Sequence, residues 1–288
     1  MNKSTNNREV RSQMAKETLD ILEKGFYINL QGSRVPLKKE IEKAICDTIL
    51  YVPDMLPVIK KDMIARIAHG RETLTSIEVT AETTLEAARR IVLDHRYGDT
   101  LCLNFASAKN PGGGFLGGSQ AQEESLARSS ALYPCIEPMN EMYTYNRNLK
   151  TCLYSDYMIH SPKVPVFRED IGKLLAEPFL VSILTAPAVN AGVVREREPH
   201  NVVKINPVMS ERIRYILSVA ALHGDKSIIL GAYGCGVFKN DPNDVAQLFK
   251  QVLIEEGYHT LFDKIVFAII DKSDAKRTLN IFKKHLIG

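Results

Sequence analysis

From residue 76 onward, short apolar segments alternate with segments of helical periodicity, and this alternation constrains the fold more than any other feature. Strands are predicted at 76–80, 100–105, 156–160, 178–185, 226–231 and 264–270. Helices are predicted at 83–94, 123–132, 208–223, 242–256 and 274–286. Because nearly continuous apolar strands are buried on both faces, helices must cover both sides of their sheet. The pattern therefore predicts an α/β sandwich.

The first 75 residues lack this alternation and are predicted to form a mostly helical extension. The stretch FYINLQGSRVPL, beginning at Phe26, indicates a short hairpin. Helices are predicted over 8–24, from Pro36 through Ile49, and from Pro57 to Gly70. We therefore expect an N-terminal extension, residues 1–75, and a main domain, residues 76–288.

Composition excludes several classes of function. The 37 lysines and arginines against 34 acidic residues give a net charge of +3, which offers no strong signal for duplex nucleic acid. The five cysteines include no C-x-x-C pair, so we expect neither disulfides nor a zinc site, and a reducing, cytoplasmic location. Neither a signal peptide nor a membrane-length apolar run is present, so no membrane partner is expected.

Two glycine-rich loops follow predicted strands. The first contains NPGGGFLGG, residues 110–118, and the second is GAYGCGVF, residues 231–238. Glycine has no side chain, so a phosphate or sugar can approach the main chain, whose N–H groups bind anions. Ligands of α/β sheets lie beyond the carboxyl ends of the strands, where both loops fall. Neither loop is a Walker A motif or a dinucleotide fingerprint, and the alternative is that the glycines only permit tight turns.

Two adjacent carboxylates, Glu123 and Glu124, begin the helix after the first loop. Adjacent helical residues point about 100° apart, so the two side chains have different surroundings. One interpretation is simple favourable placement of charge at a helix N-terminus. Their position directly after a phosphate-type loop instead favours a sugar-phosphate ligand. One carboxylate would then bind ribose hydroxyls, and the other would supply the proton that glycosidic cleavage requires.

The order of these motifs resembles one family. Gly112-Gly113-Gly114, seven further residues and Gln122-Glu123-Glu124 are similar to the signature of the bacterial-type poly(ADP-ribose) glycohydrolases. The segments LYSDYMIHSPKVPVFRED, LTAPAVNAG and GAYGCGVFKNDPNDVA resemble that family in the same order. The resemblance covers residues 76–288 and extends to the helical N-terminal part. It implies a macrodomain-like three-layer α/β/α sandwich with a mixed sheet and ADP-ribose across its crest.

The resemblance also implies roles for individual residues. Glu124, the last residue of the signature, is expected to be the catalytic acid, and Glu123 to hold the ribose hydroxyls beside the scissile bond. Phe238 is expected to form an aromatic wall for the adenosine-side ribose. The full set of expected ligand-binding residues is Asn104, Asn110, Gly112, Gly113, Gly114, Gln122, Gly234, Cys235, Gly236, Val237 and Phe238.

The implied activity is hydrolysis of the ribose–ribose O-glycosidic bond of poly(ADP-ribose), from chain ends, with release of ADP-ribose and without a metal or other cofactor. Two alternatives stay open. The first is a hydrolase for mono-ADP-ribose on proteins or nucleic acid, and the second is a non-catalytic ADP-ribose-binding macrodomain. A pure binder needs the glycine loops but not the acid, so the carboxylates argue against the second alternative.

Other polar residues receive structural interpretations. His160 and His200 are expected to be structural or solvated, and Cys235 is expected to be a small packing residue rather than a nucleophile. The run Arg195–Glu198 is interpreted as a solvated loop, with contact to the substrate polymer as the alternative. Asn190 at a strand end is a further candidate for ligand contact. The N-terminal helices are expected either to cover the adenine end of the cleft or to buttress the sheet.

Overall fold

The computed structural model describes residues 7–70, 74–93 and 99–288. Seven strands form one mixed sheet in the order β3-β6-β7-β5-β8-β9-β4. Their bounds are β3 (Ile49–Tyr51), β4 (Ser76–Thr80), β5 (Thr100–Phe105), β6 (Met158–Arg168), β7 (Leu174–Ala186), β8 (Ser227–Leu230) and β9 (Lys264–Ala268). The strands from β7 to β4 are parallel, whereas β6 runs antiparallel to both of its neighbours. A separate hairpin consists of β1 (Phe26–Ile28) and β2 (Arg34–Pro36).

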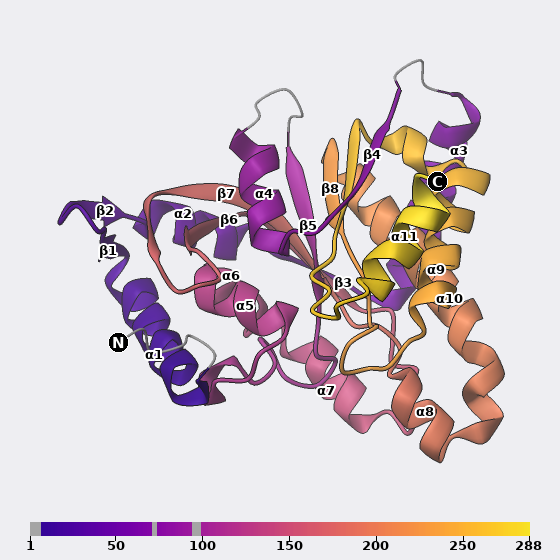
Figure 1. Ribbon diagram of the computed structural model, residues 1–288, viewed down its shortest axis with the longest axis horizontal. Helices are drawn as coiled ribbons and strands as arrows, with labels where there is room; N and C mark the ends of the chain where they lie inside the picture. The colour runs from indigo at the N-terminus through magenta and orange to yellow at the C-terminus, as the bar shows by residue number, and fades with distance from the viewer. Residues whose placement is uncertain (1–6, 71–73, 94–98) are drawn as a thin grey trace.

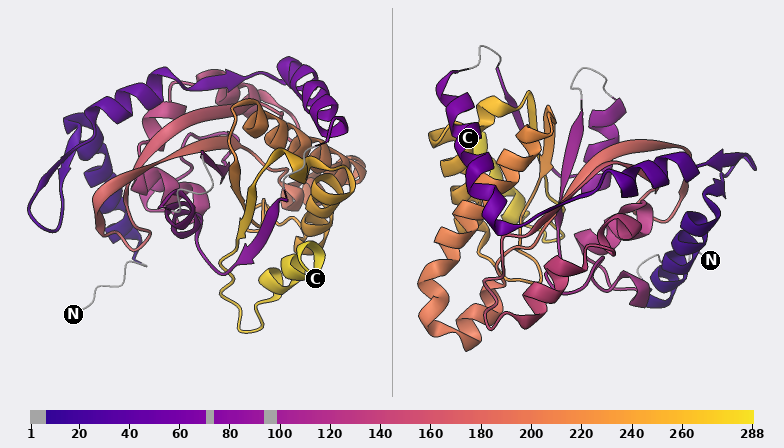
Figure 2. Two further views of the ribbon diagram at one scale, coloured as in Figure 1. Left: turned by 90° about the horizontal axis from the view of Figure 1, so that it is seen from above. Right: turned by 180° about the vertical axis from the view of Figure 1, so that it is seen from behind.

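Helices lie on both sides of the sheet (Figures 1 and 2). One side holds α1 (Arg8–Lys24), α2 (Lys38–Cys46), α4 (Thr84–Leu93), α5 (Gln122–Ser129) and α6 (Leu132–Ile136). The other holds α3 (Leu56–Ala68), α9 (Ile205–Leu222), α10 (Pro242–Lys250) and α11 (Arg277–Leu286). Two further helices, α7 (Asn140–Asn148) and α8 (Ala191–Arg197), lie beyond the strand ends at the bottom of Figure 1. The predicted three-layer, macrodomain-like sandwich is confirmed.

The central strands are buried on both faces, which explains their nearly continuous apolar sequences. In β5, Leu101 and Leu103 pack into the core on the α9 side, whereas Cys102 between them packs into the core on the α4 side. All three side chains are fully buried. Successive side chains of a strand point to opposite faces, so both faces of β5 need apolar residues.

The sequence predicted a mostly helical N-terminal part with a short hairpin. In the structure this part also contributes a strand to the main sheet. Residues 49–51 form β3, the edge strand of the main sheet, in which Leu50 lies opposite Ile159 of β6. The helix predicted from Pro36 through Ile49 covers only Lys38–Cys46, because Pro36 ends β2 and Ile49 begins β3. Pairing with the open edge of β6 outweighs the local helical periodicity. A boundary at residue 75 stays a proposal, although β3 contributes the buried Tyr51 to the main core.

Five segments between residues 132 and 198 differ from the prediction. β6 and β7 are longer than expected, because their internal prolines (Pro162, Pro165 and Pro178) made the sequence look unlike strands. The run Arg195–Glu198 ends helix α8 rather than forming a solvated loop, and Glu198 is buried. The short helices α6 and α7 were not predicted.

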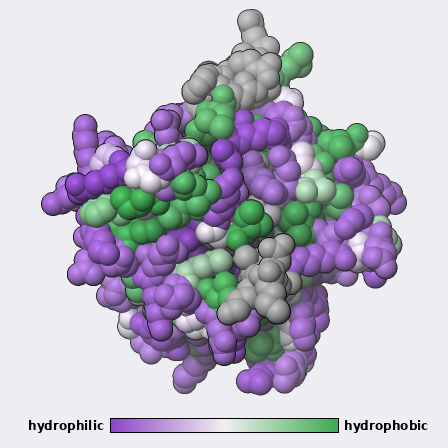
Figure 3. Space-filling model, turned by 60° about the vertical axis from the view of Figure 1, so that its left-hand side comes forward, coloured by the Kyte–Doolittle hydropathy of each residue, from purple (hydrophilic) through white to green (hydrophobic). Residues whose placement is uncertain are grey.

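The surface has the mixture of residues usual for a globular protein. On the face seen in Figure 3, hydrophilic residues predominate and hydrophobic residues form separate patches between them. In the described residues, no helix combines the length and the apolar character needed to cross a membrane.

Candidate active site

Both glycine-rich loops and both carboxylates line one cavity of about 930 Å³. It lies beyond the carboxyl ends of the parallel strands, where the chain leaves β5, β8 and β9. From the first loop and α5 it is lined by Ser107, Asn110, Gly113, Gly114, Gln122, Glu123 and Glu124. From the second loop it is lined by Gly234, Cys235, Gly236, Val237 and Phe238. The sheet therefore brings together the two loops that the sequence singled out.

The first glycine loop lies directly against the Glu124 carboxylate. Gly112 and Gly113 have φ angles of +69° and +59°, a region that side chains strongly disfavour. A Cβ atom on Gly113 would lie 2.4 Å from Glu124 Oε1. The Gly114 N–H donates to the same oxygen at 3.0 Å. The bare backbone is therefore required by the position of this carboxylate as well as by any ligand.

Glu124 is half-buried in the first turn of α5 and borders the cavity. One helical turn later, the buried Arg128 donates to the carbonyl oxygen of Ser119 at 2.7 Å. Burial lowers the pKa of Arg128 to about 10, an effect that the charge of Glu124 opposes. Arg128 therefore stays cationic at neutral pH, and it gives Glu124 a positive charge behind the cavity wall.

Glu123 has different surroundings, as the sequence predicted. Its side chain is only 3% exposed and accepts hydrogen bonds from the Ser107 N–H at 2.7 Å and from Asn104 Nδ2 at 3.3 Å. Burial raises its pKa to about 8, and the charge of Glu124 adds to this, although the hydrogen bonds from Ser107, Asn104 and Gly112 oppose it. The Glu123 carboxyl group is therefore mostly protonated at neutral pH in the unliganded protein.

The raised pKa of Glu123 predicts how stability depends on pH. In the unfolded chain Glu123 loses its proton near pH 4.5, and in the folded protein only near pH 8. Its contribution to the free energy of unfolding is therefore fully present below about pH 4.5. This contribution is lost as the pH rises to about 8, by up to about 1.4 kcal/mol per pH unit. Urea unfolding of the wild type and of Glu123→Leu across this range checks the prediction. Equal slopes in both proteins would contradict it.

The structure does not bring every predicted ligand residue into the cavity. Asn104 is fully buried behind Glu123 and donates to it and to Thr185 Oγ1, because β5 directs its side chain into the protein. Gln122 borders the cavity, but its amide accepts from the Phe105 N–H at 2.8 Å and donates to the Leu103 carbonyl oxygen at 2.7 Å. Asn104 therefore holds the Glu123 carboxylate from behind, and Gln122 attaches the start of α5 to β5.

The second glycine loop turns sharply at Gly234, whose φ is +74°. A Cβ atom there would lie 2.5 Å from Asn240 Nδ2, which donates to the carbonyl oxygen of Val189 at 2.8 Å. Burial raises the pKa of the Cys235 thiol to about 12, so it stays protonated and unreactive at neutral pH. The Phe238 ring lies 5.9 Å from the ring of Tyr154. The loop thus presents backbone and one aromatic ring to the cavity.

Helix α1 is attached to the first loop by a set of side chains that we call the carbonyl clamp. Ser12, Arg8, Arg11 and Arg128 donate in turn to the carbonyl oxygens of Leu116, Gly117, Gly118 and Ser119. The distances are 2.8, 2.8, 2.8 and 2.7 Å. The N-terminal helix therefore holds the segment that joins the glycines to α5, a role that the sequence did not predict.

Of three further residues considered in the sequence, two have structural partners and one is exposed. The His160 ring is buried and stacks on the ring of His223, with 3.5 Å between centroids, at the β3 side of the sheet. His200 is exposed. Asn190 caps helix α8 through a hydrogen bond from the Val193 N–H.

Several cavity residues escaped the sequence reasoning. They follow β4 and β9 or lie at the tip of the β6–β7 hairpin: Thr83, Thr84, Asp170, Ile269, Ile270 and Asp271. Asp170 accepts from the Thr83 hydroxyl group at 2.6 Å and also from the Ser125 hydroxyl group. The carboxyl ends of all the parallel strands share one edge of the sheet, so the segments after β4 and β9 could have been included.

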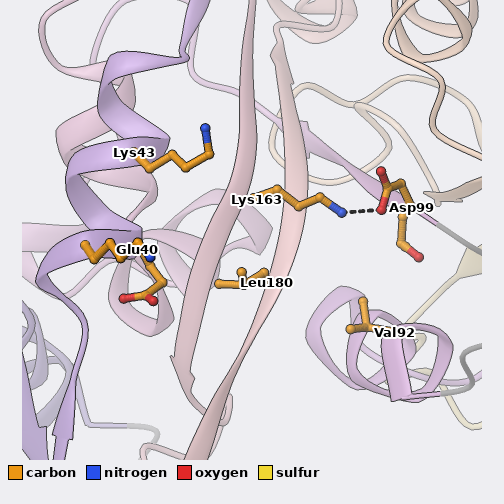
Figure 4. Close-up of a pocket in the computed structure, with 8 residues that line it drawn as sticks. Glu40, Lys43, Val92, Asp99, Lys163 and Leu180 are labelled. Atoms are coloured by element: carbon orange, nitrogen blue, oxygen red, sulfur yellow. Dashed lines mark hydrogen bonds and ion pairs between the residues drawn. The ribbon is translucent and has the colours of Figure 1, made fainter.

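A second hollow, of about 640 Å³, lies near the amino end of β5 (Figure 4). Lys43 and Leu180 line it, together with Lys163, which forms an ion pair with Asp99. It has neither a glycine loop nor a pair of adjacent carboxylates among its lining residues. The candidate active site is therefore the cavity at the other end of the strand.

The fold and the cavity together define a macrodomain-like protein whose candidate ligand site is bordered by two glycine-rich loops and two adjacent glutamates. The sequence model of the family described as the catalytic domain of microbial-type PARG, poly(ADP-ribose) glycohydrolase, matches residues 15–169. The chain belongs to this family of glycoside hydrolases.

Solved structures agree with this assignment. The chain is 40% identical to the poly(ADP-ribose) glycohydrolase of Thermomonospora curvata bound to the inhibitor ADP-HPD, with a TM-score of 0.89 over 96% of this chain and 100% of that one. It is 42% identical to the poly(ADP-ribose) glycohydrolase of Deinococcus radiodurans in complex with ADP-ribose, with a TM-score of 0.79 over 85% of this chain and 96% of that one. A comparison with curated proteins gave no match.

Proposed function

We propose that the protein hydrolyses the ribose–ribose O-glycosidic bond of poly(ADP-ribose) from chain ends and releases ADP-ribose, with Glu124 as the catalytic residue. One observation supports this most strongly. Glu124 borders the cavity with one oxygen held by the Gly114 N–H, while the neighbouring Glu123 is buried and accepts from the Ser107 N–H and from Asn104. Two carboxyl groups in unlike environments suit an acid and a hydroxyl-binding group.

The proposed reaction uses one carboxyl group twice. Glu124 donates a proton to the 2′-oxygen of the departing unit while the bond from that oxygen to the ribose C1″ breaks. The developing cation at C1″ is stabilised by the nearby diphosphate and carboxylates. Glu124, now ionised, accepts a proton from water as the water oxygen bonds to C1″, which restores the acid. A single carboxylate in both steps departs from the usual pair of catalytic carboxylates.

The ligand loops have distinct proposed roles. Gly112, Gly113 and Gly114 would place backbone against the ribose and phosphate, and residues 234–238 would bind the diphosphate through their N–H groups. Glu123 would hold the ribose hydroxyls. Asn110 borders the cavity next to this loop and is proposed as a further ligand contact. We also propose a cytoplasmic location, on the basis of the five free cysteines.

The decisive experiment measures free ADP-ribose released from labelled poly(ADP-ribose), with mono-ADP-ribosylated protein as a parallel substrate. Release from the polymer supports the proposed function. Release only from the mono-ADP-ribosylated protein favours the alternative hydrolase. Tight binding of ADP-ribose with no release from either substrate leaves a non-catalytic binding protein and rejects the enzymatic proposal.

A further inference from the structure

We infer that a basic rim beside the active-site cavity binds the second diphosphate unit of the polymer, the one joined to the unit inside the cavity. This inference rests on the proposed function. The rim consists of Lys109, Arg147, Arg195 and Lys239, arranged around the rings of Tyr154 and Phe238. It extends the cavity described above, since Tyr154 and the four cations are not among the cavity-lining residues.

Contacts show that the six residues form one continuous surface. Lys109 Nζ lies 6.0 Å from the centre of the Tyr154 ring, which lies 5.9 Å from that of Phe238. Arg147 of α7 donates to the carbonyl oxygen of Lys109 at 2.6 Å. Arg195 of α8 donates to the carbonyl oxygen of Lys239 at 2.9 Å. Figures 1 and 2 show α7 and α8 as neighbours beyond the strand ends.

The positive charges of the rim are not neutralised by carboxylates. Within the described ranges, none of the four cations forms a salt bridge with an acidic residue. The nearby Glu198 is already engaged by the Thr151 hydroxyl group and by the Cys152 N–H. The exposed Glu196 pairs with Arg197. The rim therefore keeps a net positive field toward solvent.

The backbone of the rim is held in a strained form on both sides. Tyr154 and Lys239 have φ angles of +58° and +55°, which residues with a side chain rarely adopt. Such a conformation persists only where the surroundings determine it, and it occurs preferentially at functional sites. Here it fixes the direction of one aromatic ring and of one cation.

The rim lies at the end of the cavity from which a polymer must leave. The bond to be broken joins the unit in the cavity to its neighbour, and Glu124 donates its proton to the neighbour's oxygen. The Glu124 carboxylate touches Gly113, whose N–H donates to the carbonyl oxygen of Asn110, the residue after Lys109. On the second loop, Phe238 lines the cavity and Lys239 follows it directly. The neighbouring unit therefore emerges between these two lysines.

The chemistry of that unit matches the rim. It carries a diphosphate and an adenine base, and proteins bind single-stranded polyanions by combining cations for phosphates with aromatic rings for bases. A free ADP-ribose molecule in the cavity would leave the four cations uncontacted, because none of them lines the cavity. The rim should therefore increase the affinity for polymer and not for its product.

The test replaces Lys109 and Lys239 by glutamine, which keeps the side-chain stems and leaves Arg147 and Arg195 to hold the two loops. A matched control replaces Lys61 and Lys283, exposed lysines of α3 and α11 remote from the rim. The Kd for poly(ADP-ribose) is measured with both variants also carrying Glu124→Gln, so that the polymer stays intact. KM is measured with the same variants that retain Glu124. The Kd for ADP-ribose is measured in parallel.

We expect the rim variant to bind polymer roughly tenfold more weakly and to show a matching rise in KM. The slope of log affinity for polymer against log salt concentration should become less negative by about 1.4, because two cations no longer contact phosphates. ADP-ribose affinity should equal that of the control variant. Unchanged polymer affinity and salt dependence would overturn the inference. An equal loss of affinity for ADP-ribose would also overturn it.

The result is separable from the test of the proposed function. If the wild type releases no ADP-ribose, the enzymatic proposal fails, but polymer and ADP-ribose affinities still decide whether the rim exists. If the enzyme is active and the rim variant matches its control, only the rim fails.

Discussion

Glu124→Gln should lower the rate of ADP-ribose release from poly(ADP-ribose) by about 10³-fold or more. General acid–base groups usually contribute about 10²- to 10⁴-fold, and here one group serves both the departure of the polymer and the activation of water. Glutamine keeps the size of the side chain and an oxygen that can accept from the Gly114 N–H. Single-turnover rates with labelled polymer check the prediction.

Two controls distinguish a lost acid from a damaged fold. ADP-ribose affinity and thermal stability should change little in Glu124→Gln, because the substitution leaves the loop contacts in place. Glu255→Gln changes an exposed carboxylate at the end of the helical segment Gln251–Glu255, which follows α10, and should behave as the wild type throughout. A Glu124→Gln enzyme with wild-type rate would show that another group supplies the proton.

Gly113→Ala should produce the second large effect, a fall of roughly 10²-fold in kcat with the fold retained. The added Cβ would lie 2.4 Å from Glu124 Oε1, so the carboxylate or the loop must move. A misplacement of about 1 Å at a catalytic group can cost about 10²-fold in rate. The φ angle of +59° adds backbone strain of about 1–2 kcal/mol, which should lower the melting temperature by a few degrees.

Gly224→Ala is the matched control for this substitution. Gly224 also has a positive φ, +79°, but a Cβ atom there would meet no atom within 4 Å. It should therefore lose comparable stability and keep full activity. If Gly113→Ala loses stability but retains its rate, close approach of the glycine backbone to Glu124 is not needed for catalysis.

Much of the fold could be predicted from the sequence, and the errors have physical causes. The parallel strands and their helices were predicted because the buried strands are nearly continuous in apolar residues and the helices between them show helical periodicity. β3 was missed because Ile49 continues the helical spacing of α2, and only the edge of β6, more than a hundred residues later, makes it a strand. Long-range pairing of this kind leaves no local signal.

Only part of the site could be predicted from the sequence, because the direction of a side chain and its packing leave no local signal either. The order of glycines and carboxylates along the chain located the cavity, because those residues are contiguous and follow strands. Which face each side chain uses was not visible, so Asn104 was expected at the ligand although it is fully buried behind Glu123. Arg128 lies one helical turn after Glu124, but its burial, which lowers its pKa and places its charge behind the cavity wall, depends on packing that the sequence does not reveal.

The carbonyl clamp has a consequence for the order in which the protein acquires activity. Three of its four donors lie on α1, more than a hundred residues before the carbonyl groups they bind. Contacts this distant in sequence form slowly, because a long loop must close before they stabilise anything. The catalytic loop should therefore become ordered late in folding, after the sheet, and it should be the first region to lose amide protection when α1 detaches. The protein would then become catalytically active only in a separate final folding step, in which α1 docks on the catalytic loop.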